Sequence, residues 1–187
     1  MSLRDRQRAE TRHRIQRQAI RLFVDRGYDA TTVNDVAAAA GVSAMTVYRH
    51  FPTKEDLVLY DDFDQLAAAT IGELPATGSL ADRIGRTVLA TFDLAGTHDR
   101  ELLLDRLRLM ISTPALQARH LDSQYRLQEA FVTGIDDPTA EFQTRAAAGA
   151  VLGVAYTALL RWAAEDGESS LPELFREAFT STFGQSL

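Results

Sequence analysis

Apolar side chains recur along this chain at steps of three and four residues, and no stretch alternates apolar with polar residues as a strand would. Steps of three and four place side chains on one face of a helix. The pattern predicts an all-α fold of about nine helices. They are expected near residues 6–26, 33–39, 44–50, 54–74, 80–96, 99–112, 114–134, 138–166 and 172–184.

All five prolines stand where one of these helices is expected to begin or end, which is where helices tolerate proline. They are Pro52, Pro75, Pro114, Pro138 and Pro172. The boundary near Pro52 predicts an N-terminal domain, 1–53, and a C-terminal domain, 54–187. The long helix 54–74 is expected to join them and to contribute apolar side chains to both. These side chains are Leu57, Tyr60 and Phe63 on the first domain, and Ala67, Ile71 and Leu74 on the second.

Residues 31–54 have the pattern of a helix-turn-helix motif. The first helix begins at Thr32, whose hydroxyl can cap free N–H groups while Asp35 completes an approximate capping box. Its apolar face consists of Val33, Val36, Ala37 and Ala40. Gly41 ends this helix, because glycine adopts positive φ at no steric cost, and Ser43 can cap the next one. Two helices joined by such a short turn are typical of the motif.

The second helix turns Val47 and Phe51 inward, four residues apart, and leaves its other side chains facing outward. Hydroxyls and cations bind phosphate oxygens, and arginine forms paired hydrogen bonds to a guanine edge. We predict base contacts from Ala44, Met45 and Arg49, with Arg49 as the main specificity residue. We predict phosphate contacts from Thr32, Ser43, Thr46, Tyr48, His50 and Lys54.

This stretch resembles the TetR family of repressors over about residues 10–58. The matching positions are Gly27-Tyr28, Thr31-Thr32-Val33, Asp35-Val36-Ala37, Ala40-Gly41-Val42-Ser43, Thr46-Val47-Tyr48, His50-Phe51 and Lys54. The resemblance implies an all-helical homodimer that binds an operator through three N-terminal helices. It also implies a C-terminal region that binds a small-molecule effector and the second subunit, and it favours repression.

The C-terminal part is similar to members of that family with an acyl-CoA-like ligand-binding domain. The similarity lies in Lys54-Glu55-Asp56-Leu57-Val58, Asp61-Asp62-Phe63-Asp64 and Thr113-Pro114-Ala115-Leu116. It implies an acyl-CoA effector, with an aromatic or cationic hydrophobic compound as the alternative. Pockets combine apolar walls with a few polar anchors. The predicted walls are Phe92, Leu107, Met110, Ile111, Tyr125 and Phe131, and the predicted anchors for phosphate or carboxylate are Arg106, Arg108 and Arg119.

A dimer surface is predicted on helix 138–166, where small side chains on neighbouring turns permit close approach of another helix. These residues are Ala146, Gly149, Ala150 and Gly153. The last helix adds an apolar stripe that can complete a four-helix interface, and core packing within one subunit is the alternative. The predicted contacts there are Leu174, Phe175, Ala178 and Phe179. The uncharged run between Arg145 and Arg161 has only 15 residues, which is too short to span a membrane.

Charge is distributed unevenly along the chain. The net charge is −6, yet residues 1–54 carry nine arginines and one lysine against five acids, a net +5, which leaves −11 for residues 55–187. The basic end therefore coincides with the predicted DNA-binding end. The chain has no cysteine, and its basic N-terminus lacks the apolar stretch of a secretory signal, so we expect a cytoplasmic protein.

Other functions receive less support from the sequence. Asp61, Asp62 and Asp64 cluster, but His98 and His120 have no partner at metal-ligand spacing, so no metal is expected. No cofactor is expected, and the chain has no Gly-rich phosphate loop and no nucleophile elbow, which disfavours an all-α enzyme. A helical interaction protein that does not use DNA is the remaining alternative.

Overall fold

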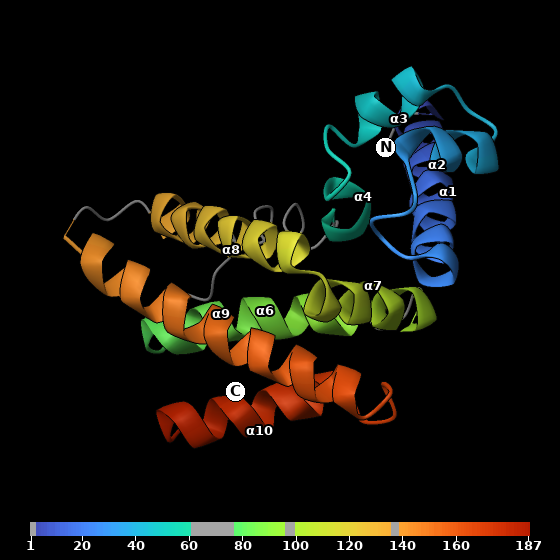
Figure 1. Cartoon of the computed structure of the whole chain (residues 1–187). Helices are drawn as coiled ribbons and strands as arrows, with labels where there is room; N and C mark the ends of the chain where they lie inside the picture. Colours follow the sequence, from blue (N-terminus) through green and yellow to red (C-terminus); the bar gives the residue numbers. More distant parts are fainter. Residues whose placement is uncertain (1–2, 61–76, 96–99, 136–138) are drawn as a thin grey trace. The chain divides into compact units, whose positions relative to one another are not determined.

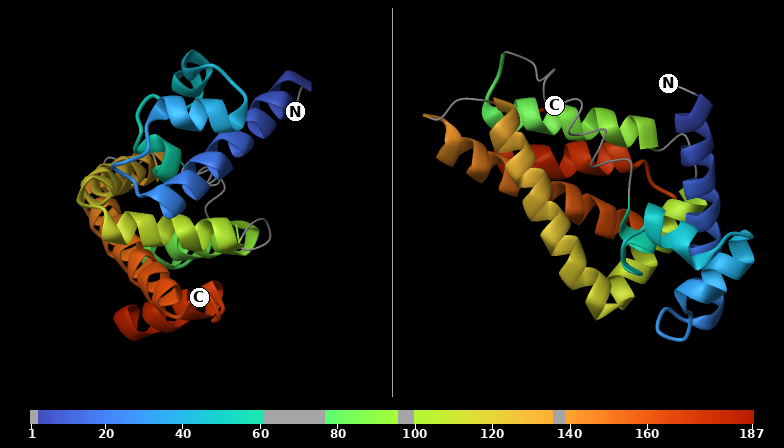
Figure 2. Two further views of the ribbon diagram at one scale, coloured as in Figure 1. Left: turned by 45° about the vertical axis from the view of Figure 1, so that its right-hand side comes forward. Right: turned by 90° about the horizontal axis from the view of Figure 1, so that it is seen from above.

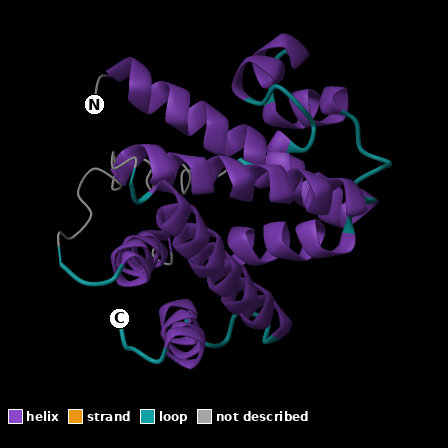
Figure 3. Ribbon diagram, turned by 90° about the vertical axis from the view of Figure 1, so that its left-hand side faces the viewer, coloured by secondary structure: helices purple, strands orange, loops and turns teal. Residues whose placement is uncertain are grey.

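The structure is a computed structural model that describes residues 3–60, 77–95, 100–135 and 139–187. Within these residues every regular element is a helix, as predicted (Figures 1 and 3). The helices are α1 (Leu3–Arg26), α2 (Val33–Ala40), α3 (Ala44–His50), α4 (Asp56–Leu59), α6 (Leu80–Ala95), α7 (Arg100–Ser112), α8 (Pro114–Ile135), α9 (Glu141–Ala164) and α10 (Leu171–Phe183).

The helix predicted at 54–74 differs from the structure. α4 ends at Leu59, and Tyr60 leaves the helix with φ −60° and ψ 120°. The carbonyl oxygen of Val58 accepts a hydrogen bond from the Arg106 side chain, which replaces the amide of a further helical turn. The prediction of an uninterrupted helix through Tyr60 was therefore wrong. The predicted contacts of Phe63, Ala67, Ile71 and Leu74 lie outside the described residues.

The chain divides into two compact units, each made of two separate stretches of the sequence, and the two consecutive domains expected from the sequence stay a prediction. Unit 1 consists of residues 1–60 together with 101–120, and unit 2 consists of 61–100 together with 121–187. Most of α7 and the first two turns of α8 therefore pack with the N-terminal helices. The helix-turn-helix is thus part of a unit to which a segment far along the chain contributes.

The core of unit 1 gathers the apolar faces of α1 to α4, whose ribbons lie together in Figure 2. Its most deeply buried apolar side chains, each at most 1% exposed, are Ile15, Ala19, Ile20, Phe23, Val36, Val47, Phe51, Leu57 and Val58, together with Leu116 from α8. α1 packs against α2 and α4, and α2 packs against α3. The apolar face predicted for the first helix of the motif is buried except at Val33, which is only half-buried.

Unit 2 is built on α6, α9 and α10, which lie side by side in Figures 1 and 2. Aromatic rings line the contact in a row. The ring centroids of Phe92 and Phe175 are 5.5 Å apart, those of Phe175 and Phe179 are 6.0 Å apart, and those of Phe179 and Phe183 are 4.5 Å apart. Phe175 and Phe179 are fully buried, so α10 turns its apolar stripe toward α6 and α9 of its own chain.

Candidate nucleic-acid interface

The turn between α2 and α3 has the geometry that the sequence predicts. The Thr32 hydroxyl accepts the Asp35 amide at 3.2 Å, and the Asp35 carboxylate accepts the Thr32 amide at 2.8 Å, which completes the capping box. Gly41 takes φ 66° and ψ 37°, a left-handed conformation that glycine adopts without a Cβ clash. Ser43 then caps α3 by accepting the Thr46 amide at 3.1 Å. These local bonds fix the angle between the two helices.

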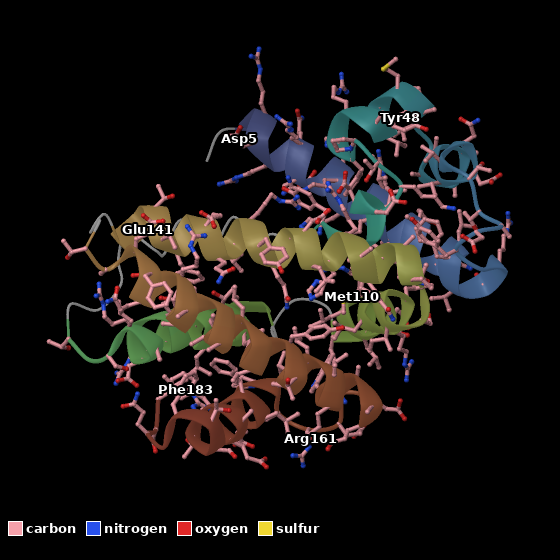
Figure 4. The ribbon with its side chains drawn as sticks, turned by 60° about the vertical axis from the view of Figure 1, so that its left-hand side comes forward. Asp5, Tyr48, Met110, Glu141, Arg161 and Phe183 are labelled. Atoms are coloured by element: carbon pink, nitrogen blue, oxygen red, sulfur yellow. The ribbon has the colours of Figure 1, made fainter. Side chains whose placement is uncertain are left out.

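The outer face of α3 is exposed over a fully buried Val47. Met45 is 76% exposed and Tyr48 is 49% exposed, which is unusual for side chains of this size. Figure 4 labels Tyr48 on this helix. Arg49 beside them is also exposed. A short helix that presents two large side chains and a guanidinium to solvent is suited to contact base edges in a major groove.

The capping hydroxyls differ in what they can offer a phosphate. The Thr32 hydroxyl donates to the Asp35 carboxylate at 2.5 Å, so its hydrogen is already used within the cap. These bonds from Thr32 also lower the pKa of Asp35, which keeps the acceptor charged. Ser43 and Thr46 share one bond between their hydroxyl oxygens at 2.9 Å, which takes one of the two hydroxyl hydrogens of the pair. The pair therefore suits a phosphate contact better than Thr32 does.

Lys54 lies at a structural position within unit 1. Its ammonium donates to the Tyr28 carbonyl oxygen at 2.6 Å and lies 4.2 Å from the centroid of the Tyr28 ring. The same ammonium lies 5.7 Å from the centroid of the Phe23 ring. A cation held between a carbonyl and an aromatic face stabilises the loop after α1. A phosphate contact by Lys54, as the sequence suggested, would compete with these bonds.

A positive corner forms where α1 passes the end of α3. The pKa of His50 is lowered by partial burial and by the charges of Arg8, Arg49 and Arg12. Arg8 and Arg12 come from α1, and the guanidinium of Arg12 also lies 4.6 Å from the centre of the Tyr60 ring. The predictions from the sequence did not include these two arginines. Their spacing of four residues, which places both on one side of α1, is the signal that could have identified them.

Two of the predicted ligand anchors contact α4. The Arg106 Nε donates to the Val58 carbonyl oxygen at 2.7 Å, and its Nη2 donates to the Tyr60 carbonyl oxygen at 3.0 Å. Arg119 Nη2 lies 3.5 Å from a carboxylate oxygen of Asp56. Both arginines therefore have protein partners in unit 1, and their role as ligand anchors stays a prediction.

The other predicted ligand residues are divided between the two units. Leu107 and Met110 are buried in unit 1, Ile111 is 38% exposed, and Arg108 is exposed with Asp105 at 3.9 Å. The remaining three belong to unit 2. There Phe92 and Phe131 are buried and Tyr125 is 67% exposed. The ligand site remains a prediction.

The predicted dimer residues fall into two groups. On α9 all four small residues, Ala146, Gly149, Ala150 and Gly153, are exposed. Phe142, one turn before them, is 79% exposed.

On α10 the prediction of a dimer contact was wrong for three of its four residues. Leu174 is 7% exposed, and Phe175 and Phe179 are not exposed at all. They pack inside unit 2, and only Ala178 is partly accessible. The apolar stripe was real, but it is covered by helices of the same chain.

α9 is also long and apolar enough to cross a membrane, by length and composition alone, with a mean hydropathy of 1.3. It is the one such helix among the residues that the structure describes. Nine of its residues are buried within unit 2, as in the core helix of a soluble protein.

The acidic cluster Asp61, Asp62 and Asp64 and the residue His98 lie outside the described residues. In the described parts of the chain, no three metal-ligating side chains gather.

Two family models match the chain, one on each side of residue 60. Residues 15–60 match the bacterial regulatory proteins of the tetR family, and residues 79–183 match the MftR C-terminal domain. The chain is 31% identical over 183 residues to a protein of Mycobacterium tuberculosis described as the mycofactocin biosynthesis transcriptional regulator MftR. This alignment covers 93% of the chain and 90% of that protein.

Solved structures with the same fold include two regulators bound to acyl-CoA molecules. FadR of Thermus thermophilus, a TetR family repressor in complex with lauroyl-CoA, is 23% identical with a TM-score of 0.56, over 94% of this chain and 95% of that one. FadR of Bacillus subtilis in complex with stearoyl-CoA is 20% identical with a TM-score of 0.54, over 89% of this chain and 95% of that one. At these identities the likeness shows the fold alone.

Proposed function

Because the chain belongs to the TetR family of bacterial transcriptional regulators, we propose that it is a cytoplasmic repressor that binds a palindromic operator as a homodimer. A small molecule bound by the C-terminal region releases it from DNA. The observation that carries the proposal is the exposed face of α3, with Met45, Tyr48 and Arg49 above a rigid capped turn. The net charge of +5 on residues 1–54 supports it, because cationic surfaces attract the phosphate backbone.

Each residue of the interface has a role in this proposal. Ala44, Met45 and Arg49 face the bases, and Ser43, Thr46, Tyr48 and His50 face the phosphates. Thr32 acts mainly as the cap of α2, and Lys54 acts mainly through Tyr28. Arg8 and Arg12 add positive charge beside His50.

The Arg49→Ala variant tests the base-reading role. Loss of a paired contact to a guanine lowers affinity for the operator by about 1–3 kcal/mol, while affinity for random duplex changes much less. Fluorescence anisotropy with both duplexes measures the two effects. Arg86→Ala, which removes an exposed arginine from α6, is the matched control and leaves both affinities unchanged. Equal losses of Arg49→Ala on the operator and on random DNA would show that Arg49 reads no base.

His50 is expected to make DNA binding pH-dependent. In the free protein its pKa is lowered, so the imidazole is neutral at pH 7. Nearby phosphates raise the pKa, so binding takes up a proton and affinity increases as the pH falls from about 7.5 to about 6. The same fall in pH also lowers the stability of unit 1. The pKa of His50 is higher in the unfolded chain than in the folded one, so the unfolded chain binds the proton first. Anisotropy measures the change in operator affinity with pH, and circular dichroism measures the change in folding. If operator affinity depends on pH equally in the wild type and in His50→Gln, the phosphate contact of His50 is refuted.

The dimer is proposed to form through the exposed small residues of α9. Gly153 is the best position for a test, because a Cβ added there meets nothing within 4 Å in the protomer. Since this position is also exposed, we expect Gly153→Leu to leave the protomer folded and to block close approach of a second helix. Sedimentation equilibrium is expected to show a monomer and operator binding is expected to weaken. A variant that stays dimeric with unchanged affinity would place the interface elsewhere.

For the effector we propose a long-chain acyl-CoA. The two FadR structures support this class, since each binds such a molecule in the same fold. The apolar and aromatic candidates from Phe92 to Phe131, together with Arg108, remain the proposed ligand residues. Lauroyl-CoA added to the operator complex is expected to release the protein. Retention on DNA would favour the aromatic or cationic class of effector.

A further inference from the structure

The short helix α4 is held at its C-terminal end by a side chain from a distant part of the chain. A one-turn helix leaves its carbonyl groups without amide partners. Arg106 of α7 donates to one of them, the carbonyl oxygen of Val58, at 2.7 Å, and to the carbonyl oxygen of Tyr60, the residue that follows the helix, at 3.0 Å. A guanidinium is well suited to this place, because it brings a positive charge to the negative end of the helix and has several donors.

The carbonyl oxygen of Tyr60 also binds α1. Gln16, which is 5% exposed, donates to it from Nε2 at 2.7 Å. A carbonyl oxygen has two lone pairs, so Gln16 and Arg106 together fill its acceptor capacity. Side chains of α1 and α7 therefore bind the same carbonyl oxygen. A shift of α7 would move this oxygen and weaken the hydrogen bond of the buried Gln16 amide.

The ring of Tyr60 extends this connection to the recognition helix. It meets the Phe51 ring edge-on, with centroids 5.7 Å apart and planes at 87°. Phe51 is the C-cap residue of α3, and its amide donates to the Val47 carbonyl at 2.8 Å. Only one residue, Tyr60, therefore lies between the guanidinium of Arg106 and the end of α3.

The other end of α4 is held in a similar way. Thr53 and Asp56 exchange hydrogen bonds at 2.9 Å and 3.2 Å, and Arg119 of α8 lies 3.5 Å from Asp56. Residues 101–120 thus contact both ends of α4 through two arginines. This agrees with their membership of unit 1.

We infer that Arg106 is a positioning residue for DNA recognition: through the carbonyl oxygens of Val58 and Tyr60 it fixes the placement of α3 relative to α1. The inference rests on the proposed function for its meaning in DNA binding. It assigns Arg106 a role inside the protein, at the point where the segment after residue 100 meets the helix-turn-helix.

The test compares the full-length chain with Arg106→Met, which keeps much of the apolar stem and removes every donor. Arg86→Met is the control, since it removes the same charge from an exposed position, on α6, that has no role in the proposed sites. Affinities for the operator and for random duplex are measured by anisotropy, and amide hydrogen exchange is followed along the chain. We expect Arg106→Met to lower operator affinity about 3- to 30-fold, to change random-duplex affinity no more than the control does, and to speed exchange at Val47–Phe51.

Two further variants make the test specific. Arg106→Lys keeps the charge and a donor and is expected to recover part of the operator affinity. Gln16→Met combined with Arg106→Met is expected to lose less affinity than the product of the two single losses, because both side chains act through the same oxygen.

Several results would overturn the inference. One is unchanged exchange in α3 for Arg106→Met, and another is faster exchange throughout α6, α9 and α10 as well, which would indicate a general loss of stability. A double variant whose loss of operator affinity equals the product of the two single losses would also overturn it. If the unaltered chain does not prefer any duplex, the proposed function fails, and the exchange at Val47–Phe51 still decides whether Arg106 positions α3.

Discussion

Replacement of Phe51 by alanine is expected to destabilise the helix-turn-helix by about 3–5 kcal/mol and to abolish operator binding. The ring is 1% exposed and packs at the junction of α3 and Tyr60. Its removal takes away apolar burial and leaves a cavity. Since small units have only a modest margin of stability, a loss of this size leaves little folded helix-turn-helix at equilibrium.

Amide exchange in α1–α3 measures this loss, and anisotropy measures the loss of DNA binding. Met45→Ala is the contrasting variant, because Met45 is 76% exposed on the neighbouring helix face. It is expected to change stability by less than about 0.5 kcal/mol while it weakens operator binding. A Phe51→Ala variant with native exchange rates would refute the packing described for α3.

Phe175→Ala is expected to lower the free energy of unfolding of unit 2 by about 3–5 kcal/mol. Phe175 is fully buried between Phe92 and Phe179, so its loss leaves a cavity inside the protomer. Trp162 is the only tryptophan of the chain, is 4% exposed and lies in α9, so its fluorescence reports the unfolding of this unit in urea.

The dependence on protein concentration distinguishes core from interface. If Phe175 belongs to the core, the loss is the same at every concentration. If it belonged to a dimer interface, the variant would regain stability as the concentration rises. Phe142→Ala is the matched control, because this ring is 79% exposed and its removal is expected to change protomer stability by less than about 0.5 kcal/mol.

Local features of the fold could be predicted from the sequence. The capped start of α2, the glycine turn and the start of α3 depend on residues within about four positions of one another, and the structure confirms them at Thr32, Gly41 and Ser43. The helix boundaries expected at Pro114 and Pro172 were also close, because the same short-range chemistry decides them.

Features that depend on distant residues could not be predicted. Lys54 binds a carbonyl 26 residues earlier, and Arg106 binds one 48 residues earlier. Periodicity shows that the stripe of Phe175 and Phe179 is buried, but it does not show whether the same chain or a partner covers it. The end of α4 was missed for the same reason, since side chains of α1 and α7 bind the carbonyl groups there.

The most direct test of the account is the affinity of the full-length protein for the duplex that it selects from a randomised pool, compared with a scrambled duplex of the same composition. We predict a selected sequence with two inverted half-sites, bound about a thousandfold or more tightly than the scrambled one, with an affinity that falls steeply as salt is added. Selection without a common sequence, or equal affinity for both duplexes, would contradict the assignment of α3 as a DNA-reading helix.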